Sequence, residues 1–131
     1  MIYLNILRRN SFLLVKYFQG NRSPLGVQRI EEGSSRAWAH HIVENKHHFQ
    51  HWLDITEQGE VIPVEMPFRY ALELVCDSIA AAKVYKGVPL DRKEPLRHWE
   101  EKVNKELIHP ETAKIINQLF ENYVKTGKVS L

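Results

Sequence analysis

Apolar and polar positions alternate along most of this chain with the period of an α-helix. Apolar residues recur three and four positions apart in five stretches, and proline or glycine stands at several of their ends. Ser34 or Ser35 offers an N-cap to the second stretch. The pattern predicts helices over residues 2–19, 35–53, 67–87, 95–103 and 110–127.

One stretch departs from the helical period. After Ile55 the chain reads TEQGEVIPVEM, where a glycine is followed by three β-branched residues in the four positions 61–64. This predicts a short hairpin near residues 55–64. The expected fold is therefore all-α, a single helical domain over residues 1–131 with one small hairpin.

Composition agrees with a globular protein of one core. The 131 residues are 44% hydrophobic and 26% charged, with a net charge of +2. No apolar stretch approaches the roughly 20 residues of a membrane span, so no membrane partner is expected. The single cysteine, Cys76, excludes a disulfide within the chain, and the N-terminal residues lack the charge order of a signal peptide. We expect a cytoplasmic protein.

Positive charge gathers at the start of the sequence. Residues 1–30 contain no acid and five bases, Arg8, Arg9, Lys16, Arg22 and Arg29. Such an arm can contact nucleic acid, but no basic run exceeds two residues, which favours ordinary surface charges. We do not expect a nucleic-acid partner. Arg22, in a loop rich in glycine and proline, is a candidate anion-binding residue.

Five of the seven histidines lie between His40 and His51. If the helix over 35–53 is continuous, a helical wheel places His41 and His48 at the edge of its apolar face. The same wheel places His40, His47 and His51 on the opposite face. His47 and His51, four positions apart on the outward face, can chelate zinc or can belong to a solvated polar face. The edge pair can be metal ligands or histidines whose hydrogen bonds are satisfied within a core.

A carboxylate falls where the helix over 67–87 is apolar nearly all round, so we expect Asp77 to be buried. Glu73 lies one turn earlier, and two like charges at this spacing are unfavourable without a cation. A metal ion can provide that cation, and so can Arg36, Arg69 or a lysine. Both alternatives remain open.

Six segments of the sequence form a recognisable set: KYFQGNRSP (16–24), AWAHH (37–41), NKHHFQHW (45–52), MPFRY (66–70), CDSIAAAKVY (76–85) and HPETA (109–113). With these segments the sequence resembles an uncharacterised bacterial and phage family over residues 12–122. That family is similar to a divergent branch of the HD superfamily of metal-dependent phosphohydrolases, which implies an HD-like helical bundle that binds divalent metal. Metal ligands in that superfamily are an early histidine, a consecutive His-Asp dyad, further histidines and a late aspartate.

Carried over by position, the resemblance gives metal-ligand roles to His41, His47, His48 and Asp77. It places Asn45 and Lys46 near a bound phosphate. The dyad should lie upstream of KYFQG, at or before Met1, yet no histidine precedes His40. We therefore expect the N-terminal metal-ligand helix to be missing or altered, and the metal site to be incomplete.

Two functions follow as expectations. The first is a metal-dependent phosphohydrolase-like protein, with weak or no activity on a small phosphorylated molecule. The second is a non-catalytic helical module that forms a homo-oligomer through its N-terminal segment, with structural histidines. The aromatic residues Trp38, Phe49, Trp52, Phe68 and Trp99 are expected to pack in the core without a chemical role. The thiol of Cys76 is expected to be buried and unreactive.

Overall fold

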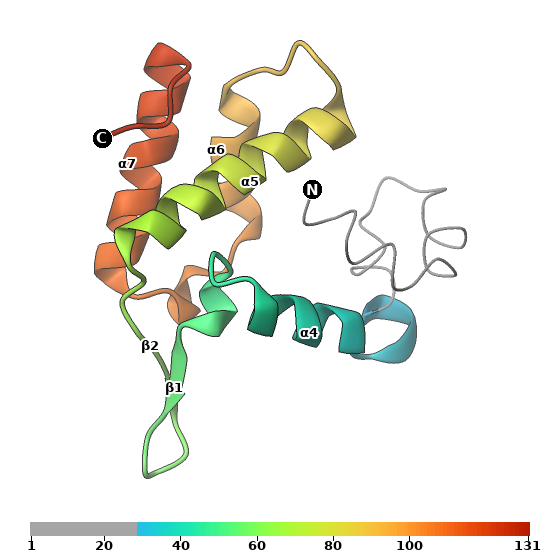
Figure 1. Cartoon of the computed structure of the whole chain (residues 1–131), viewed down its shortest axis with the longest axis vertical. Helices are drawn as coiled ribbons and strands as arrows, with labels where there is room; N and C mark the ends of the chain where they lie inside the picture. The colour runs from blue at the N-terminus through green and yellow to red at the C-terminus, as the bar shows by residue number, and fades with distance from the viewer. Residues whose placement is uncertain (1–28) are drawn as a thin grey trace. The chain divides into compact units, whose positions relative to one another are not determined.

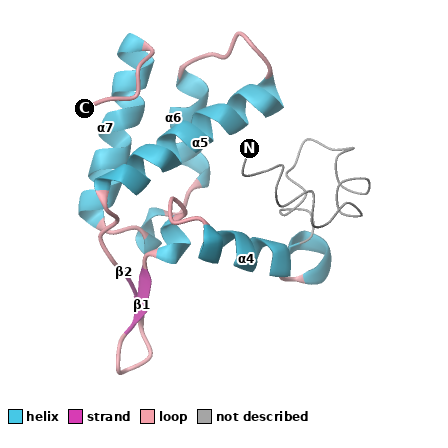
Figure 2. Ribbon diagram, viewed as in Figure 1, coloured by secondary structure: helices cyan, strands magenta, loops and turns pink. Residues whose placement is uncertain are grey.

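The computed structural model describes residues 29–131 and divides the chain into two compact units, residues 1–45 and 46–131. Helices account for 63% of the described residues, and two short strands form one antiparallel sheet (Figures 1 and 2). The prediction of a mainly helical protein with one hairpin is confirmed. The helix predicted over residues 2–19 and the loop that holds Arg22 lie outside the described residues.

In the first unit, helix α4 spans Arg36–Glu44. Ser35 caps it as predicted, because its hydroxyl oxygen accepts a hydrogen bond from the backbone N–H of Trp38. The helix ends at Asn45, whose backbone is extended (φ −126°, ψ 100°) and whose side-chain amide donates to the carbonyl oxygen of His41. The predicted continuation to residue 53 is wrong, since that side chain takes over a carbonyl of the last turn.

The second unit begins with a turn of 3₁₀ helix, η1 (Phe49–His51), and the hairpin. Strands β1 (Leu53–Ile55) and β2 (Val61–Pro63) pair with Ile55 opposite Val61. Gly59 closes the turn at a positive φ of 84°, which glycine adopts without strain. The predicted hairpin is confirmed, with its first strand starting two residues earlier.

Three helices complete this unit: α5 (Phe68–Lys86), α6 (Lys93–Lys102) and α7 (Pro110–Thr126), with the 3₁₀ turn η2 (Lys105–Leu107) before α7. Gly87 and Gly127 end α5 and α7 as predicted, both at positive φ. Helix α6 begins at Lys93 rather than Pro95. Asp91 accepts a hydrogen bond from the Lys93 N–H there, and proline in the first turn needs no donor of its own.

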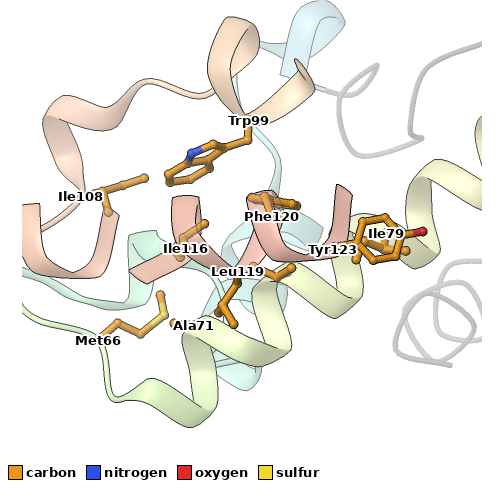
Figure 3. Close-up of a cluster of buried hydrophobic side chains, with 10 residues drawn as sticks. Met66, Ala71, Ile79, Trp99, Ile108, Ile116, Leu119, Phe120 and Tyr123 are labelled. Carbon is orange, nitrogen blue, oxygen red and sulfur yellow. The ribbon is translucent and has the colours of Figure 1, made fainter. Parts of the chain in front are cut away.

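The core of the second unit forms where α5 and α6 pack against α7. Helix α5 contributes the stripe Ala71, Val75 and Ile79, four residues apart. The indole of Trp99 on α6 lies beside Phe120 of α7, with ring centroids 6.0 Å apart (Figure 3). The buried hydrophobic residues are Met66, Ala71, Val75, Ile79, Trp99, Ile108, Ile116, Leu119, Phe120 and Tyr123.

The aromatic residues predicted to be core divide between inside and outside. Trp99 is buried, and Phe49 and Trp52 pack against the core from partly exposed positions. Phe68 is 45% exposed, so its assignment to the core is wrong. It is the first residue of α5 and lies at the very end of the stripe that faces α7, one turn before Ala71. Trp38 is half-buried in the first unit.

No helix within residues 29–131 combines the length and the apolar character that crossing a membrane requires.

One buried hydrogen bond ties the end of the hairpin to α7. The backbone N–H of Met66 donates to Oγ1 of Thr112 over 2.9 Å, and both residues are 2% exposed. The bond fixes the chain immediately before α5 begins. The entry of α5 therefore depends on a polar side chain in an otherwise apolar contact.

We predict that Thr112→Val, which keeps the side-chain shape, lowers the free energy of unfolding by about 1–3 kcal/mol, because the Met66 N–H stays buried without an acceptor. Urea unfolding followed by circular dichroism measures this. Thr126→Val on the exposed end of the same helix is the control and should change stability by less than about 0.5 kcal/mol. Equal stability of the two variants would contradict the prediction.

Candidate metal centre

His47 lies in the short connection that follows α4, and its side chain is buried, with the residue 3% exposed. The helical wheel had placed it on a solvated face, and that placement is wrong. The wheel required a continuous helix, whereas the helix ends at Asn45. Past that residue the backbone no longer turns 100° per position, so spacing along the sequence does not report direction.

Aromatic residues hold this connection in place. The indole N–H of Trp52 donates to the carbonyl oxygen of Lys46 over 2.6 Å. The Trp52 ring in turn lies against Tyr70 of α5, with centroids 5.7 Å apart. Because the indole both packs on α5 and binds the Lys46 carbonyl, it directs the next residue, His47, toward α5.

Helix α5 presents two carboxylates to the His47 imidazole. Oδ2 of Asp77 lies 3.5 Å from Nε2, and Oε2 of Glu73 lies 3.9 Å from Nδ1. The two ring nitrogens therefore face different carboxylates, one turn of helix apart. His47 is thus the group that the structure places beside both acids, and no ion pair of Arg69 with either acid is found among the described residues.

Asp77 is not buried as predicted. Its side chain is 49% exposed and that of Glu73 52% exposed. The reason is the stripe of α5 that packs on α7: Val75 and Ile79 flank Asp77 by two residues each, which turns the carboxylate about 200° away from the core. Val84, seven residues further along the same side of the helix, is 73% exposed, so this side of α5 faces solvent there as well.

His48 is half-buried, and its ring centroid lies 4.5 Å from that of His47. Each ring offers one nitrogen, and these two atoms lie within 4.8 Å of one another. The two imidazoles therefore lie side by side, and His47 is the one that faces both carboxylates of α5. Imidazole and carboxylate donors together suit divalent zinc, iron, manganese, cobalt or nickel.

The separation of the donors fits a common ion. Two ligands that each lie about 2.0–2.1 Å from a tetrahedral ion are roughly 3.3 Å apart. The 3.5 Å between His47 Nε2 and Asp77 Oδ2 is close to this value. Only small side-chain rotations are required for both atoms to coordinate the same ion.

His41 belongs to the first unit, where it is buried in the last turns of α4. Its Nδ1 lies 3.1 Å from the amide nitrogen of Asn45, and its ring centroid lies 5.6 Å from that of Trp38. Asn45 thereby contacts both the ring and the carbonyl oxygen of His41. The metal-ligand role of His41 and the phosphate contact of Asn45 stay predictions.

Two cations lie over the ring of Tyr70, in the first turn of α5. Nζ of Lys46 lies 6.0 Å from the centroid of the Tyr70 ring, and the guanidinium carbon of Arg69 lies 4.8 Å from it. Arg69, Glu73 and Asp77 succeed one another every four residues, on one face of α5. Arg69 was considered only as an ion-pair partner in the sequence, although its spacing from Glu73 could have indicated a place at this site.

The other histidines lie on or near the surface. His40 and His98 are exposed, as predicted for surface residues. His51 is half-buried edge-on to Trp52 rather than solvated, and His109 caps α7 by accepting a hydrogen bond from the Glu111 N–H at Nδ1.

Cys76 precedes Asp77 and is exposed, so the prediction of a buried thiol is wrong. Partial burial of the sulfur raises the pKa of the Cys76 thiol above its ordinary value, and the negative charges of Asp77 and Glu73 raise it further. The thiol is therefore protonated at neutral pH and slow to react, despite its exposure.

We predict that Asp77→Asn makes Cys76 react faster with iodoacetamide at pH 7–8. Loss of one negative charge lowers the thiol pKa and increases the thiolate fraction. The measurement is the alkylation rate against pH, followed by mass spectrometry. Glu94→Gln, on α6, is a charge-matched control that should leave the rate profile unchanged. A profile for Asp77→Asn that coincides with the unsubstituted protein would contradict the prediction.

Comparison with known proteins adds one finding. No curated protein and no solved structure matches the chain. The model of a family of unknown function, DUF5662, matches residues 11–122, nearly the whole sequence. That range includes His47 and His48, both carboxylates, helices α5 and α6, and α7 up to residue 122. The chain belongs to this family of unknown function.

Proposed function

We propose that the protein binds one divalent transition-metal ion through His47 Nε2, His48 and Asp77. The observation that carries the proposal is the 3.5 Å approach of His47 Nε2 to Asp77 Oδ2, from two segments thirty positions apart in the sequence. A buried imidazole facing a half-exposed carboxylate leaves one side of the ion open to solvent. Open coordination positions distinguish reactive metal sites from purely structural ones.

Glu73 acts in this proposal as the positioning residue for His47. Its carboxylate lies toward Nδ1, on the side of the ring away from Asp77. A carboxylate in that place attracts the proton to Nδ1 and leaves the lone pair of Nε2 for the ion. The same arrangement fixes the orientation of the ring. Glu73 therefore tunes the affinity of the site without touching the ion.

We further propose that the bound ion supports slow hydrolysis of a phosphoester, in keeping with an HD-like ancestry of the helical domain. A divalent ion supplies Lewis-acid polarisation of a phosphoryl oxygen and a lowered pKa for a coordinated water. Because Asp77 and His48 are both partly exposed, an ion that they bind would keep one side accessible to a substrate from solvent. Lys46 and Arg69 supply positive charge for the anionic phosphoryl group of the ester.

We predict that chelator-treated protein takes up one zinc, manganese or nickel ion per chain, and that His47→Ala or Asp77→Asn weakens binding at least about tenfold. Isothermal titration calorimetry and elemental analysis measure affinity and stoichiometry. Glu73→Gln should weaken binding less than Asp77→Asn does. His41→Ala tests whether the first unit adds a ligand.

The control for this titration is His98→Ala, an exposed histidine of α6 outside the site. It should bind the ion as tightly as the unsubstituted chain. Equal affinity of His47→Ala and His98→Ala would exclude the proposed centre, since exposed histidines alone would then account for binding.

We predict that the metal-loaded protein hydrolyses bis(p-nitrophenyl) phosphate slowly but above the rate of the free ion, and that Asp77→Asn removes the excess. Release of p-nitrophenolate is followed by absorbance with saturating metal. Arg69→Ala should raise KM while metal affinity stays unchanged. Stoichiometric binding without hydrolysis would reject the enzyme and leave the metal centre in place.

A further inference from the structure

The hairpin of the second unit is an acidic arm with an apolar surface, here called the acidic arm (residues 53–65). It contains four acids and no lysine, arginine or histidine. All four acids are exposed: Asp54, Glu57, Glu60 and Glu65. Between them lie four exposed aliphatic side chains, Ile55 (68%), Val61 (50%), Ile62 (40%) and Val64 (41%). Ile55 and Val61 pair on one face of the ribbon, and Ile62 lies on the other face opposite Asp54. Exposed aliphatic side chains among charges are typical of a contact site rather than of a free loop.

The arm also has unpaired strand edges. Within the described part of the chain, β1 and β2 form a sheet of two strands only. Such a ribbon leaves a row of backbone donors and acceptors on each outer edge, and it is marginally stable in isolation. Contact with a further surface would cover both the edges and the aliphatic side chains.

A complementary surface lies at the other end of α5, here called the basic end (residues 83–93). It carries four exposed bases and a single acid, Asp91, for a net charge of +3 (four minus one). The bases are Lys83, Lys86, Arg92 and Lys93. Three exposed apolar residues accompany them, Val84 (73%), Tyr85 (40%) and Val88 (79%). The acidic arm and the basic end thus match in charge and in apolar character.

The two surfaces cannot meet within one molecule. The acidic arm directly precedes α5 and the basic end follows it, so the 19 residues of that helix separate them (Figure 1). The separation is roughly 28 Å along the helix axis. It is about three times the distance over which salt screens charges in physiological solution. Each surface can therefore find its complement only on another molecule.

We propose that copies of this protein associate head to tail, with the acidic arm of one chain bound to the basic end of the next. Such a contact joins two different surfaces, so a pair of copies retains one free acidic arm and one free basic end, and assembly continues into rings or chains. The apolar residues of both surfaces supply the buried area, and the charges select the partner. The proposal is independent of the metal centre.

A charge-exchange experiment tests the pairing on the full chain, in a chelator that prevents metal bridging. The arm variant carries Glu57→Lys, Glu60→Lys and Glu65→Lys, which changes the arm from −4 to +2. The end variant carries Lys83→Glu, Lys86→Glu and Lys93→Glu, which changes the end from +3 to −3. Sedimentation velocity over a range of concentrations and salt reports association.

The unsubstituted chain is expected to self-associate more strongly at low salt than at high salt. Each variant alone should associate at least about tenfold more weakly, because its two surfaces then repel. An equimolar mixture of the variants should regain association, since each reversed surface meets an opposite one. A chain that carries all six substitutions should regain it alone.

Matched controls change the same charge elsewhere. Glu100→Lys with Glu101→Lys and Glu106→Lys, or Lys114→Glu with Lys125→Glu and Lys128→Glu, alter exposed positions outside both surfaces and should leave association unchanged. Circular dichroism melting confirms that each variant is folded. The proposal is overturned if the unsubstituted chain is a monomer at every concentration and salt. It is also overturned if the charge exchange leaves association unchanged, as expected for contact through the N-terminal segment.

Discussion

The packing of α5 against α7 determines where every chemical group of the second unit lies. Ala71, Val75 and Ile79 form the stripe that α5 buries, and the facing residues of α7 are almost fully enclosed. Once that stripe is fixed, the helical repeat leaves Glu73 and Asp77 with no position except the opposite face. The core therefore places two like charges one turn apart in half-exposed surroundings. The connection at residues 46–48 then brings an imidazole to both of them.

How much of this the sequence could predict depended on how local each signal is. Caps and breakers act within a few residues, so Ser35, Gly87 and the turn at Gly59 were located correctly from their chemistry alone. The apolar pattern does not show where α4 ends, because a helical wheel treats Asn45 as one more helical residue. Its amide, which binds the carbonyl of His41, is a stop signal of the same local kind.

The site residues show the opposite situation. His47 and Asp77 are both candidates from the sequence, but the pattern predicts an exposed histidine and a buried aspartate, and the structure has the reverse. Direction depends on which face of a helix meets a neighbour, and α5 is apolar on more than one face. Its sequence offers both Leu72 and Leu74 as alternatives to the stripe that α7 selects. Burial of the histidine depends on Trp52, whose contacts with Lys46 and Tyr70 cross elements and leave no periodic trace.

The inverted burial also changes what the site can do. A buried carboxylate beside exposed histidines would bind a counter-ion tightly and exclude solvent from it. The structure has the reverse order, with an enclosed imidazole and half-exposed acids. Enclosure restricts the imidazole to one orientation, which favours selection among divalent ions by geometry. Exposure keeps the acids accessible, so a ligand for the open positions can arrive from solvent. A reactive metal site needs ligands of fixed orientation and access from solvent. The proposed centre combines the two, because its imidazole is enclosed while its acids lie on the exposed face of α5.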